Sequence, residues 1–529
     1  MERHRDPALG APLDPAACYR ALQSRDARFD GRLFVAVTST GIYCRPVCPA
    51  RTPRFENCRF FPSAAAAQGQ GFRPCLRCRP ETAPDLASWR GTSNSVARAL
   101  ALIAEGALDR DAEASAGQAG TETGAEAGVE ALAARLGLGG RQLRRLFRQH
   151  LGASPVAVAQ TRRVLFAKQL IQETGLPMAE IALAAGFGSV RRFNETFQAL
   201  YRRPPSALRR RAAAEAPPAA LAEAGVTLRL RYRPPYDWPS MLGFLAARAI
   251  EGVETVERDV YRRTLAEDGC LGTAEVRHEP GRDCLAATIR VGSLRALPAV
   301  VARLRRVFDL GADIETIGRH LSRDPMMAAL VAARPGLRAP GGWDGFELAL
   351  RAVLGQQVTI AAALGLAGRL VALCGAALPP DAGGPGLERA FPTPAEVAAA
   401  DLAPLGMPQA RRATLKALAA ATLADPRLFQ PLGDIEASLA RLRAIPGVGD
   451  WTAHYIALRA LRETDAFPAG DVGLQRGAAT AGGRPTPGEL LLRAEAWRPW
   501  RAYAAQHLWA ADAAAATPAA PAEREVALA

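Results

Sequence analysis

The sequence lacks the features that mark membrane and exported proteins. Its 529 residues contain no long apolar span and no lipidation signal. The first twenty residues, MERHRDPALGAPLDPAACYR, are charged and lack the apolar core of a signal peptide. Cysteines number only nine, and an odd count in a long chain argues against a disulfide framework. We therefore expect a cytoplasmic protein whose thiols serve metal binding or catalysis.

Positive charge is concentrated in one segment. The chain carries 66 Lys and Arg against 52 Asp and Glu, a formal net charge of +14. Residues 129–211 hold 15 of the basic and 4 of the acidic side chains, so +11 of the excess lies there. Because no apolar span accompanies this block, nucleic acid is favoured over a membrane as its polyanionic partner.

Stretches without apolar periodicity divide the chain, whose length predicts several domains. Residues 105–128 are acidic and rich in Ala and Gly, which predicts a flexible insertion. The Ala- and Pro-rich residues 211–225 separate the basic segment from a region with strand-like patterns. Residues 375–386 predict a long loop within a final helical region, and residues 513–529 a disordered tail.

Four cysteines near the N-terminus have metal-ligand spacing. They form a Cys-x3-Cys pair and, after 26 residues, a Cys-x2-Cys pair: Cys44, Cys48, Cys75 and Cys78. Each pair can bind one tetrahedral metal from a tight turn, and zinc is favoured over an iron–sulfur cluster at these spacings. The spacing alone indicates one zinc ion per chain and leaves open a purely structural role.

The residues around these pairs, GIYCRPVCPART and GFRPCLRCRPE, resemble the zinc domain of the bacterial adaptive-response (Ada-type) methylation sensor. The resemblance implies a small α/β domain over residues 10–88, in which Cys44 accepts a methyl group from a DNA methylphosphotriester. Four thiolates on one zinc carry a net charge of −2, which repels ordinary phosphodiesters but admits a neutral methylated phosphate.

A repeat with an offset of 50 residues lies in the basic segment. Its apolar members recur at i, i+4 and i+8 after a glycine-containing turn, which predicts one buried helix face in each copy. The matched pairs are Leu143 and Phe193, Phe147 and Phe197, Leu151 and Tyr201, and Pro155 and Pro205. The repeat predicts two helix-turn-helix units, with a solvated basic bundle as the plainer alternative.

The opposite helix faces are polar and basic, and we expect them to contact DNA. They carry Arg141, Gln142, Arg144, Arg145 and Arg148 in the first copy, and Ser189, Arg191, Arg192 and Asn194 in the second. The stretch MAEIALAAGFGSVRRFNETFQALYRRPPSALR resembles the AraC-type DNA-binding domain, which implies such a domain over residues 92–211. Tyr201 departs from this family, which commonly has glycine there.

Beyond residue 225 the pattern indicates a second functional half. Alternating VTLRLRYRPPYDW, helical SMLGFLAARAI and alternating CLAATIRV predict a small α+β domain over residues 225–308. YRPPYDWPSMLGFLAARAIEGVETV and ARPGLRAPGGWDGFELALRAVLGQQVTIAAA resemble the inducible 3-methyladenine DNA glycosylase (AlkA-type). That likeness continues to about residue 512 and implies an all-α helix-hairpin-helix domain over residues 309–512.

The stretch LARLRAIPGVGDWTAHYIALRAL reads as a helix, a Gly-x-Gly hairpin and a second helix. Gly447 and Gly449 lack Cβ atoms, so nearby backbone N–H groups can approach a DNA phosphate. The resemblance to base-excision glycosylases implies that hairpin carbonyls, here those of Arg443, Ile445 and Val448, can also hold an alkali cation. Bifunctional relatives have a lysine nucleophile where this chain has Trp451, so a monofunctional enzyme is expected.

The same resemblance assigns the reacting groups. Asp471, in FPAGDVGLQR, matches the family's catalytic aspartate, which stabilises positive charge on the deoxyribose. Trp451, Tyr455 and Trp509 occupy the positions of an aromatic cleft that attracts a cationic alkylated base, with core packing as the alternative for each ring. Gln357, in GQQV, stands where the family inserts an apolar wedge beside the flipped base.

Together these features predict a multidomain, mainly α protein for alkylation repair: methyl acceptor, transcriptional activator and monofunctional glycosylase. The implied partners are double-stranded DNA and RNA polymerase, with no membrane and a monomeric state. The Pro-Cys-His-Arg motif of the sensor family's methyltransferase domain is missing, so no direct O6-alkylguanine repair is expected. Two alternatives stay open: a regulator whose glycosylase half only binds DNA, and a zinc module that serves the enzyme alone.

Overall fold

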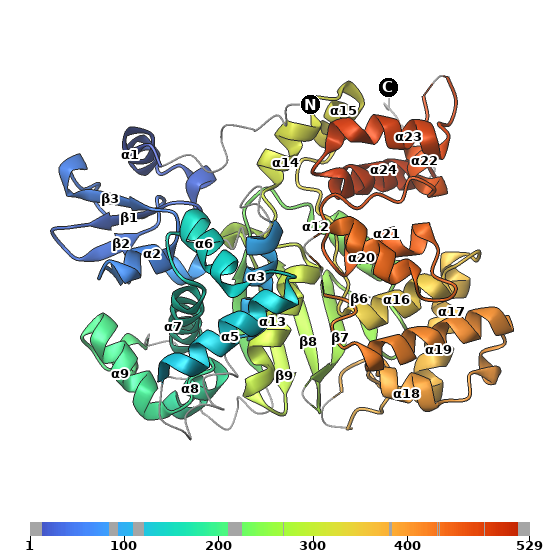
Figure 1. Ribbon diagram of the computed structural model, residues 1–529, viewed down its shortest axis with the longest axis horizontal. Coiled ribbons are helices and arrows are strands. Elements are labelled where there is room, and N and C mark those ends of the chain that lie inside the picture. Colours follow the sequence, from blue (N-terminus) through green and yellow to red (C-terminus); the bar gives the residue numbers. More distant parts are fainter. Residues whose placement is uncertain are drawn as a thin grey trace, which may run out of the picture.

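The structure is a computed structural model. It describes residues 13–83, 94–108, 121–209, 225–267, 269–379, 383–430, 432, 434–480 and 482–516. Helices dominate these residues, and the strands form a four-stranded and a five-stranded sheet (Figure 1). In Figure 1 the small sheet lies at one end, the large sheet in the middle and the helices after residue 344 toward the other end. None of the described helices is long and apolar enough to cross a membrane.

The N-terminal domain is a small sheet flanked by two helices. Strand order is β3-β1-β2-β4, with β1 antiparallel to β2 and β3, and β2 parallel to β4. Its elements are α1 (Pro15–Gln23), β1 (Phe34–Val37), β2 (Ile42–Cys44), β3 (Cys58–Phe61), α2 (Ala64–Gly69) and β4 (Arg73–Pro74). The predicted α/β zinc domain has this architecture.

The basic segment folds as two helix-turn-helix units joined by one long helix, α7. The helices are α3 (Asn94–Ala104), α5 (Thr121–Arg135), α6 (Gly140–Leu151), α7 (Pro155–Glu173), α8 (Met178–Ala184) and α9 (Val190–Tyr201). The repeat is confirmed in three dimensions, because its apolar members on α6 and α9 are all buried. Ser154 and Ser189 cap the N-termini of α7 and α9 with their side-chain oxygens.

An antiparallel sheet of order β5-β9-β8-β7-β6 forms the centre of the molecule. Its strands are β5 (Val226–Arg231), β6 (Glu254–Glu257), β7 (Val260–Glu267), β8 (Cys270–Glu279) and β9 (Cys284–Val291), with helices α12 (Trp238–Ala246) and α13 (Leu297–Val307). Alternating buried residues along β5, such as Leu228 and Leu230, face the core beneath α12 and α13. The expected α+β domain is thus present.

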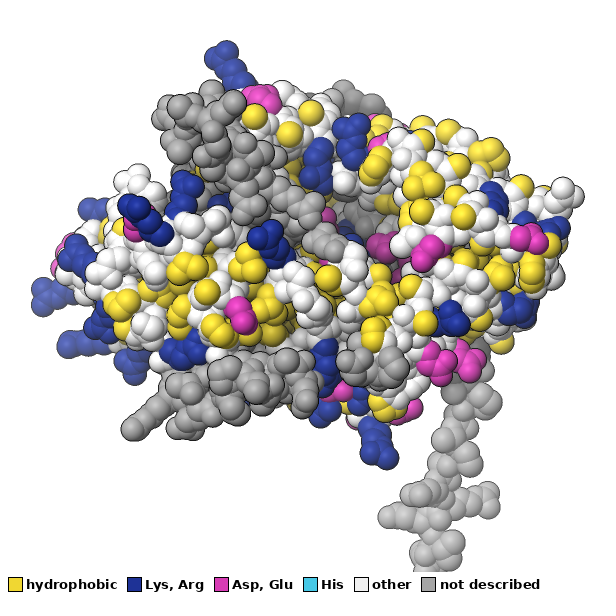
Figure 2. All heavy atoms as spheres, turned by 90° about the horizontal axis from the view of Figure 1, so that it is seen from below, with side chains coloured by type: hydrophobic (Ala, Val, Ile, Leu, Met, Phe, Trp, Pro, Cys, Tyr) yellow, Lys and Arg dark blue, Asp and Glu magenta, His cyan; other side chains and the backbone are white. Residues whose placement is uncertain are grey.

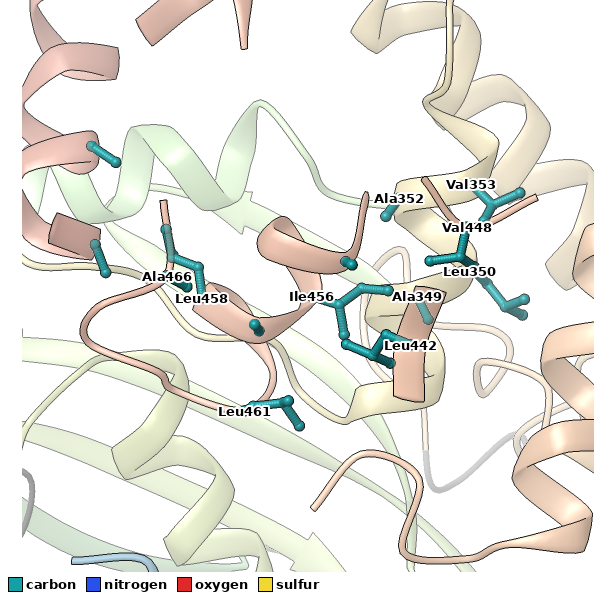
Figure 3. Close-up of a cluster of buried hydrophobic side chains, with 14 of the residues drawn as sticks. Ala349, Leu350, Ala352, Val353, Leu442, Val448, Ile456, Leu458, Leu461 and Ala466 are labelled. Atoms are coloured by element: carbon teal, nitrogen blue, oxygen red, sulfur yellow. The ribbon is translucent and has the colours of Figure 1, made fainter. Parts of the chain in front are cut away.

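The last third of the chain is a helical domain. Its helices are α14 (Ile314–Leu321), α15 (Pro325–Ala333), α16 (Gly345–Leu354), α17 (Ile360–Cys374), α18 (Pro394–Ala399), α19 (Gln409–Ala424), α20 (Ile435–Arg443), α21 (Asp450–Arg459), α22 (Val472–Gly477), α23 (Pro487–Ala494) and α24 (Arg501–Ala516). Helix α16 is buried along most of its length. Figure 3 shows Val353 and Leu350 of α16 beside Val448, with Leu442 and Ile456 close to Ala349. This core holds the hairpin between α20 and α21 in place.

Helix α7 covers the free edge of the central sheet. Strand β5 is an outer strand, paired only with β9 among the described strands. On its open side, the backbone N–H of Arg229 donates to Glu173 Oε2 at 3.0 Å, and Gln169 Nε2 donates to the Arg229 carbonyl at 3.2 Å. Side chains of the DNA-binding segment therefore satisfy both backbone groups of an edge residue.

Two expectations about flexible segments need correction. Helix α5 begins at Thr121, so the last part of residues 105–128 is helical, and helix α24 continues past Asp512 to Ala516. Residues 513–516 are all alanine, the best helix former, whereas the residues 121–128, TETGAEAG, include two glycines and extend the amphipathic helix that follows. Residues 109–120 and 517–529 lie outside the described residues, whereas the loop expected over 375–386 contains no helix where it is described.

A buried ion network joins the central sheet to α16. Glu347 accepts from Arg263 at 2.8 Å and from Arg351 at 2.6 Å, and Arg351 also donates to Glu254. Burial raises the pKa of Glu347, but the two guanidinium groups outweigh it and lower that pKa to about 2. The carboxylate therefore stabilises the fold above the ordinary glutamate pKa, and this contribution disappears as pH falls toward 2.

We expect Glu347→Gln to lower the free energy of unfolding at neutral pH by about 3 kcal/mol, because it leaves two buried guanidinium groups without their carboxylate. The loss should shrink progressively below about pH 4.5, where the wild-type carboxylate also becomes protonated. Denaturant unfolding at several pH values measures it. Glu275→Gln is the control, since Glu275 forms comparable ion pairs in a more exposed position and should cost less than about 1 kcal/mol. Equal costs for both variants would contradict the assignment.

Candidate active site and metal centre

The four cysteines converge at one end of the small sheet. Strands β2 and β4 run parallel, and Cys75 N donates to the Tyr43 carbonyl at 2.9 Å, so Cys44 and Cys75 leave adjacent strands at the same end. The turns that follow bring in Cys48 and Cys78. All four sulfur atoms lie within 4.8 Å of one another. Tetrahedral zinc with bonds of about 2.3 Å to sulfur requires ligand atoms roughly 3.8 Å apart, so this quartet fits one zinc ion.

The four sulfurs differ in environment. Cys48, Cys75 and Cys78 are buried, whereas Cys44 is partly exposed. The backbone N–H of Arg77 donates to Cys75 Sγ at 3.3 Å, and that of Arg45 donates to Cys78 Sγ at 3.4 Å. Within the described part of the chain, no backbone N–H donates to the sulfur of Cys44. Cys44 is therefore the ligand whose charge is most available to a molecule outside the protein.

The metal centre is linked to the DNA-binding segment through a buried lysine. Lys168 of α7 has no exposed surface, and its Nζ donates to Glu81 at 2.7 Å and to the Cys75 carbonyl at 3.4 Å. The same Nζ lies 5.9 Å from the ring centroid of Tyr201, on α9. Arg79 continues the network from Glu81 to Glu173. One helix thus contacts both the cysteine loop and the second helix-turn-helix unit.

The predicted DNA-contacting side chains lie on the outer faces of α6 and α9. All are exposed except Arg144, which is partly buried beside Glu130; the exposed ones are Arg141, Gln142, Arg145, Arg148, Ser189, Arg191, Arg192 and Asn194. Arg191 is paired with Glu195 at 2.8 Å. Figure 2 shows basic side chains gathered toward the end of the molecule that carries the zinc domain and α9. This distribution suits a polyanion that spans both units.

The sequence predicts a departure from the AraC-type family, which commonly has glycine, at Tyr201. The structure places it one residue later, at Arg202. Tyr201 is buried, stacks on Phe197 and occupies the same place as Leu151 in the first unit. The helix ends one residue later, at Gly152 with φ of 66° and at Arg202 with φ of 55°. Because a left-handed C-cap favours glycine, Arg202 is the residue that departs from the family pattern, and Gly152 follows that pattern.

The two hairpin glycines have different roles. Gly447 has a φ of 84°, and a Cβ atom there would lie 1.9 Å from Thr414 Oγ1 of α19, so glycine is required by the interior of the domain. Gly449 is the N-cap of α21, and a Cβ atom there would meet nothing within 4 Å. The open approach to a phosphate, expected for both, therefore holds at Gly449 only.

Gln356 is a candidate residue that the sequence reasoning missed. Its Nε2 donates to the Gly447 carbonyl and to Thr452 Oγ1, each at 3.1 Å, which ties the turn after α16 to the hairpin. The neighbouring Gln357 is exposed at the tip of this turn, with a left-handed φ of 56°. The structure therefore presents the predicted wedge residue beside the hairpin.

Asp471 is held by donors from three segments. Trp451 Nε1 donates to its Oδ2 at 2.7 Å, and Trp509 Nε1 donates to its Oδ1 at 2.9 Å. The backbone N–H of Leu474 donates to Oδ1 at 3.0 Å, which makes Asp471 the N-cap of α22. A carboxylate has about four acceptor positions, so about one remains free.

The predicted aromatic residues form one cluster around this carboxylate. Trp451 and Tyr455, both on α21, stack at 5.2 Å with an interplanar angle of 9°. Tyr455 meets Trp509 of α24 edge to face at 6.3 Å. All three rings are partly exposed, in contrast to the fully buried Trp497. The structure therefore brings the hairpin, the aspartate and a half-open aromatic wall together.

Family models match successive parts of the chain. They are the "Metal binding domain of Ada" over residues 17–81, a "Helix-turn-helix domain" over 132–211, the "AlkA N-terminal domain" over 227–344 and the "HhH-GPD superfamily base excision DNA repair protein" over 350–502.

One relative matches nearly the whole chain, and two others match parts of it. A Mycobacterium tuberculosis protein named "Probable bifunctional transcriptional activator/DNA repair enzyme AlkA" is 44% identical over 93% of this chain and 95% of its own length. "DNA-3-methyladenine glycosylase 2" of Escherichia coli is 38% identical over 53% of this chain and 95% of its own length. "Bifunctional transcriptional activator/DNA repair enzyme AdaA" of Bacillus subtilis is 30% identical over 34% of this chain and 75% of its own length. The chain therefore belongs to the family of bifunctional AlkA-type proteins that join a transcriptional activator to a DNA repair enzyme.

Proposed function

We propose that this protein excises alkylated bases of the 3-methyladenine type from DNA, and that Asp471 is the catalytic residue. The observation that carries the proposal is the placement of one carboxylate, fixed by two indole N–H groups, between an aromatic wall and a DNA-binding hairpin. Family membership and the named glycosylase relative support it. The same arrangement disfavours a regulator whose second half only binds DNA, since binding alone needs no carboxylate fixed by two indole N–H groups.

The reaction requires the target nucleotide to leave the duplex stack. Gln357, exposed at the tip of its turn, fills the gap and offers its amide to the unpaired base, in place of the apolar wedge of relatives. The flipped base lies against Trp451, Tyr455 and Trp509, whose electron-rich faces attract an alkylated cationic purine by roughly 0.5–2 kcal/mol per contact. Specificity for damaged bases follows from this charge preference.

Asp471 stabilises positive charge that develops on the deoxyribose as the glycosidic bond breaks. Three of its acceptor positions are occupied, so the remaining one faces the sugar or orients the attacking water. Trp451 offers no amine, so no Schiff base forms and the DNA strand stays intact. Hairpin N–H groups near Gly449 would bind a phosphate, and the carbonyls of Arg443, Ile445 and Val448 would hold an alkali cation.

A second proposed activity is irreversible methyl transfer to Cys44. Cys44, Cys48, Cys75 and Cys78 would hold the zinc ion, which would keep their sulfurs deprotonated. The Cys44 thiolate attacks the methyl carbon of a methylphosphotriester, the carbon–oxygen bond breaks, and the phosphate keeps the electron pair and regains its negative charge. The partial exposure of Cys44 supports this assignment over the three buried ligands.

We further propose a monomer that binds an operator through residues 129–211 and recruits RNA polymerase.

Asp471→Asn should lower single-turnover release of 3-methyladenine by about 10²- to 10³-fold, because the charge opposite the developing cation is lost. Binding to the same duplex should stay within a few-fold of wild type, and borohydride should trap no adduct with either protein. Asp512→Asn is the matched control: Asp512 lies near the site but pairs with Arg476 at the surface. Near wild-type excision by Asp471→Asn would overturn the assignment.

Freshly reduced protein should contain one zinc per chain and take up one methyl group from methylphosphotriester DNA, which fragment mass spectrometry should locate on Cys44. Cys58→Ser should retain both properties, since Cys58 lies in a separate apolar cluster. Cys44→Ser should accept no methyl group. Clearly substoichiometric zinc, or methyl on another cysteine, is the result that contradicts this proposal.

Methylation of Cys44 should raise operator affinity, because the centre changes from −2 to −1 beside DNA phosphates. One unit of charge at about 7 Å corresponds to roughly 0.6 kcal/mol in water and about 2.4 kcal/mol at an effective dielectric of about 20. Over two or three phosphates the gain reaches tens-fold at low salt and decreases as salt is added. Affinities of methylated and unmethylated protein for an operator selected from random DNA test it. Equal affinities at low salt would leave the zinc centre without a regulatory role.

A further inference from the structure

A buried arginine lies behind the aromatic wall. Arg459, the last residue of α21, has only 2% of its surface exposed. Its Cζ lies 5.0 Å from the ring centroid of Trp509, 5.7 Å from that of Tyr455 and 4.6 Å from that of Phe244 on α12. Its NH1 donates to the Pro340 carbonyl at 2.9 Å and its NH2 to Gln506 Oε1 at 2.8 Å. Its hydrogen-bond acceptors are therefore neutral.

Among the described residues, no ion pair involves Arg459, so no carboxylate in direct contact neutralises its charge. Of the two other buried arginines in the domain, Arg501 is paired with Asp465, whereas Arg338 donates to backbone carbonyls only. Burial lowers the pKa of Arg459 to about 10, so the side chain keeps its proton at neutral pH. A buried, uncompensated charge destabilises a fold, and its presence beside the site calls for a functional reason.

We propose that Arg459 is an electrostatic positioning residue. Its positive charge favours the transfer of positive charge from the bound base to the deoxyribose. This rests on the proposed function, in which the base stacks against Tyr455 and Trp509. The rings separate the guanidinium from the base, and the edge of Trp509 donates to Asp471. The guanidinium thus lies over the ring of one indole, and the carboxylate lies at the Nε1 edge of the same indole.

The field between them has the direction that the reaction needs. As the C1′–N bond breaks, its electron pair stays on the base nitrogen, so a cationic base becomes neutral and the sugar becomes cationic. Water then adds to C1′ and releases a proton to solvent. Arg459 destabilises the cationic base before cleavage and stabilises the electron pair that the base acquires, whereas Asp471 stabilises the sugar. A neutral base gains negative charge in the same step and benefits equally.

The size of the effect follows from distance. A base stacked about 3.5 Å beyond the Trp509 ring lies roughly 8–9 Å from the guanidinium. At an effective dielectric of about 20, one unit of charge at that distance corresponds to about twentyfold to thirtyfold, and the partial charge of the transition state to about tenfold in rate. Arg459 therefore acts through the rings without touching the reacting atoms.

The test is single-turnover excision from duplexes that contain 7-methylguanine, which is cationic, or hypoxanthine, which is neutral. We expect Arg459→Met to lower the maximal rate about tenfold on both duplexes. It should also strengthen binding of the 7-methylguanine duplex and leave binding of the hypoxanthine duplex unchanged. Arg459→Lys, which keeps the charge, should recover most of the rate. Gln506→Met removes a hydrogen bond to Arg459 but no charge, and should change the rate by no more than about twofold.

The outcomes separate three situations. A structural role for Arg459 predicts equal losses in Arg459→Met and Gln506→Met, weaker binding of both duplexes and no rescue by lysine; any of these overturns the proposal. An Arg459→Met protein that does not fold, judged by thermal unfolding, leaves the lysine and Gln506 variants to decide: lysine must retain at least a third of the rate. Wild-type protein that releases neither of these bases, nor 3-methyladenine from methylated DNA, refutes the proposed function itself, independently of Arg459.

Discussion

The repair half of the molecule depends on one carboxylate that two indole rings hold by their edges. Trp451 follows the hairpin directly, and Trp509 comes from the final helix, so Asp471 joins segments that are 20 and 38 residues away along the chain. Each indole has one N–H to donate, and both N–H groups donate to the Asp471 side chain. Hairpin, aspartate and aromatic wall are consequently one unit, and a shift of the hairpin moves the carboxylate with it.

A few buried charged side chains also connect the modules. Lys168 contacts the cysteine loop through Glu81 and the Cys75 carbonyl, while α7, which carries it, connects the two helix-turn-helix units. Asp313 and Thr316 of the helical domain accept from Arg32 of the zinc domain, and Arg98 of α3 is paired with Glu463. Buried ion pairs rather than apolar surface make these contacts specific. In any other arrangement of the modules, a buried charge would lose its partner and destabilise the contact.

The sequence predicted the parts whose signal is local or periodic. Cysteine spacing predicted the quartet, and an offset of 50 residues predicted which faces of α6 and α9 are buried. Features that depend on contacts between distant residues were missed. Gln356 contacts a hairpin carbonyl 91 residues away, and Gly447 is required by Thr414, which is 33 positions earlier. Motif resemblance singled out the aromatic residues, but that two of them hold Asp471 depends on tertiary geometry. The charge behind them has no sequence signature, since an arginine in a helix is ordinarily solvated.

Helix α7 protects the outer edge of strand β5. An outer strand with unpaired N–H and C=O groups is a template for pairing with another chain, and proteins block such edges to stay soluble. Here Gln169 and Glu173 of the regulatory segment perform that protection for the repair domain's sheet. Without the regulatory segment, the backbone N–H and C=O of Arg229 would lose these protein partners and face solvent. Helix α7 therefore has a second, structural role as the cover of a sheet edge that belongs to the other half of the chain.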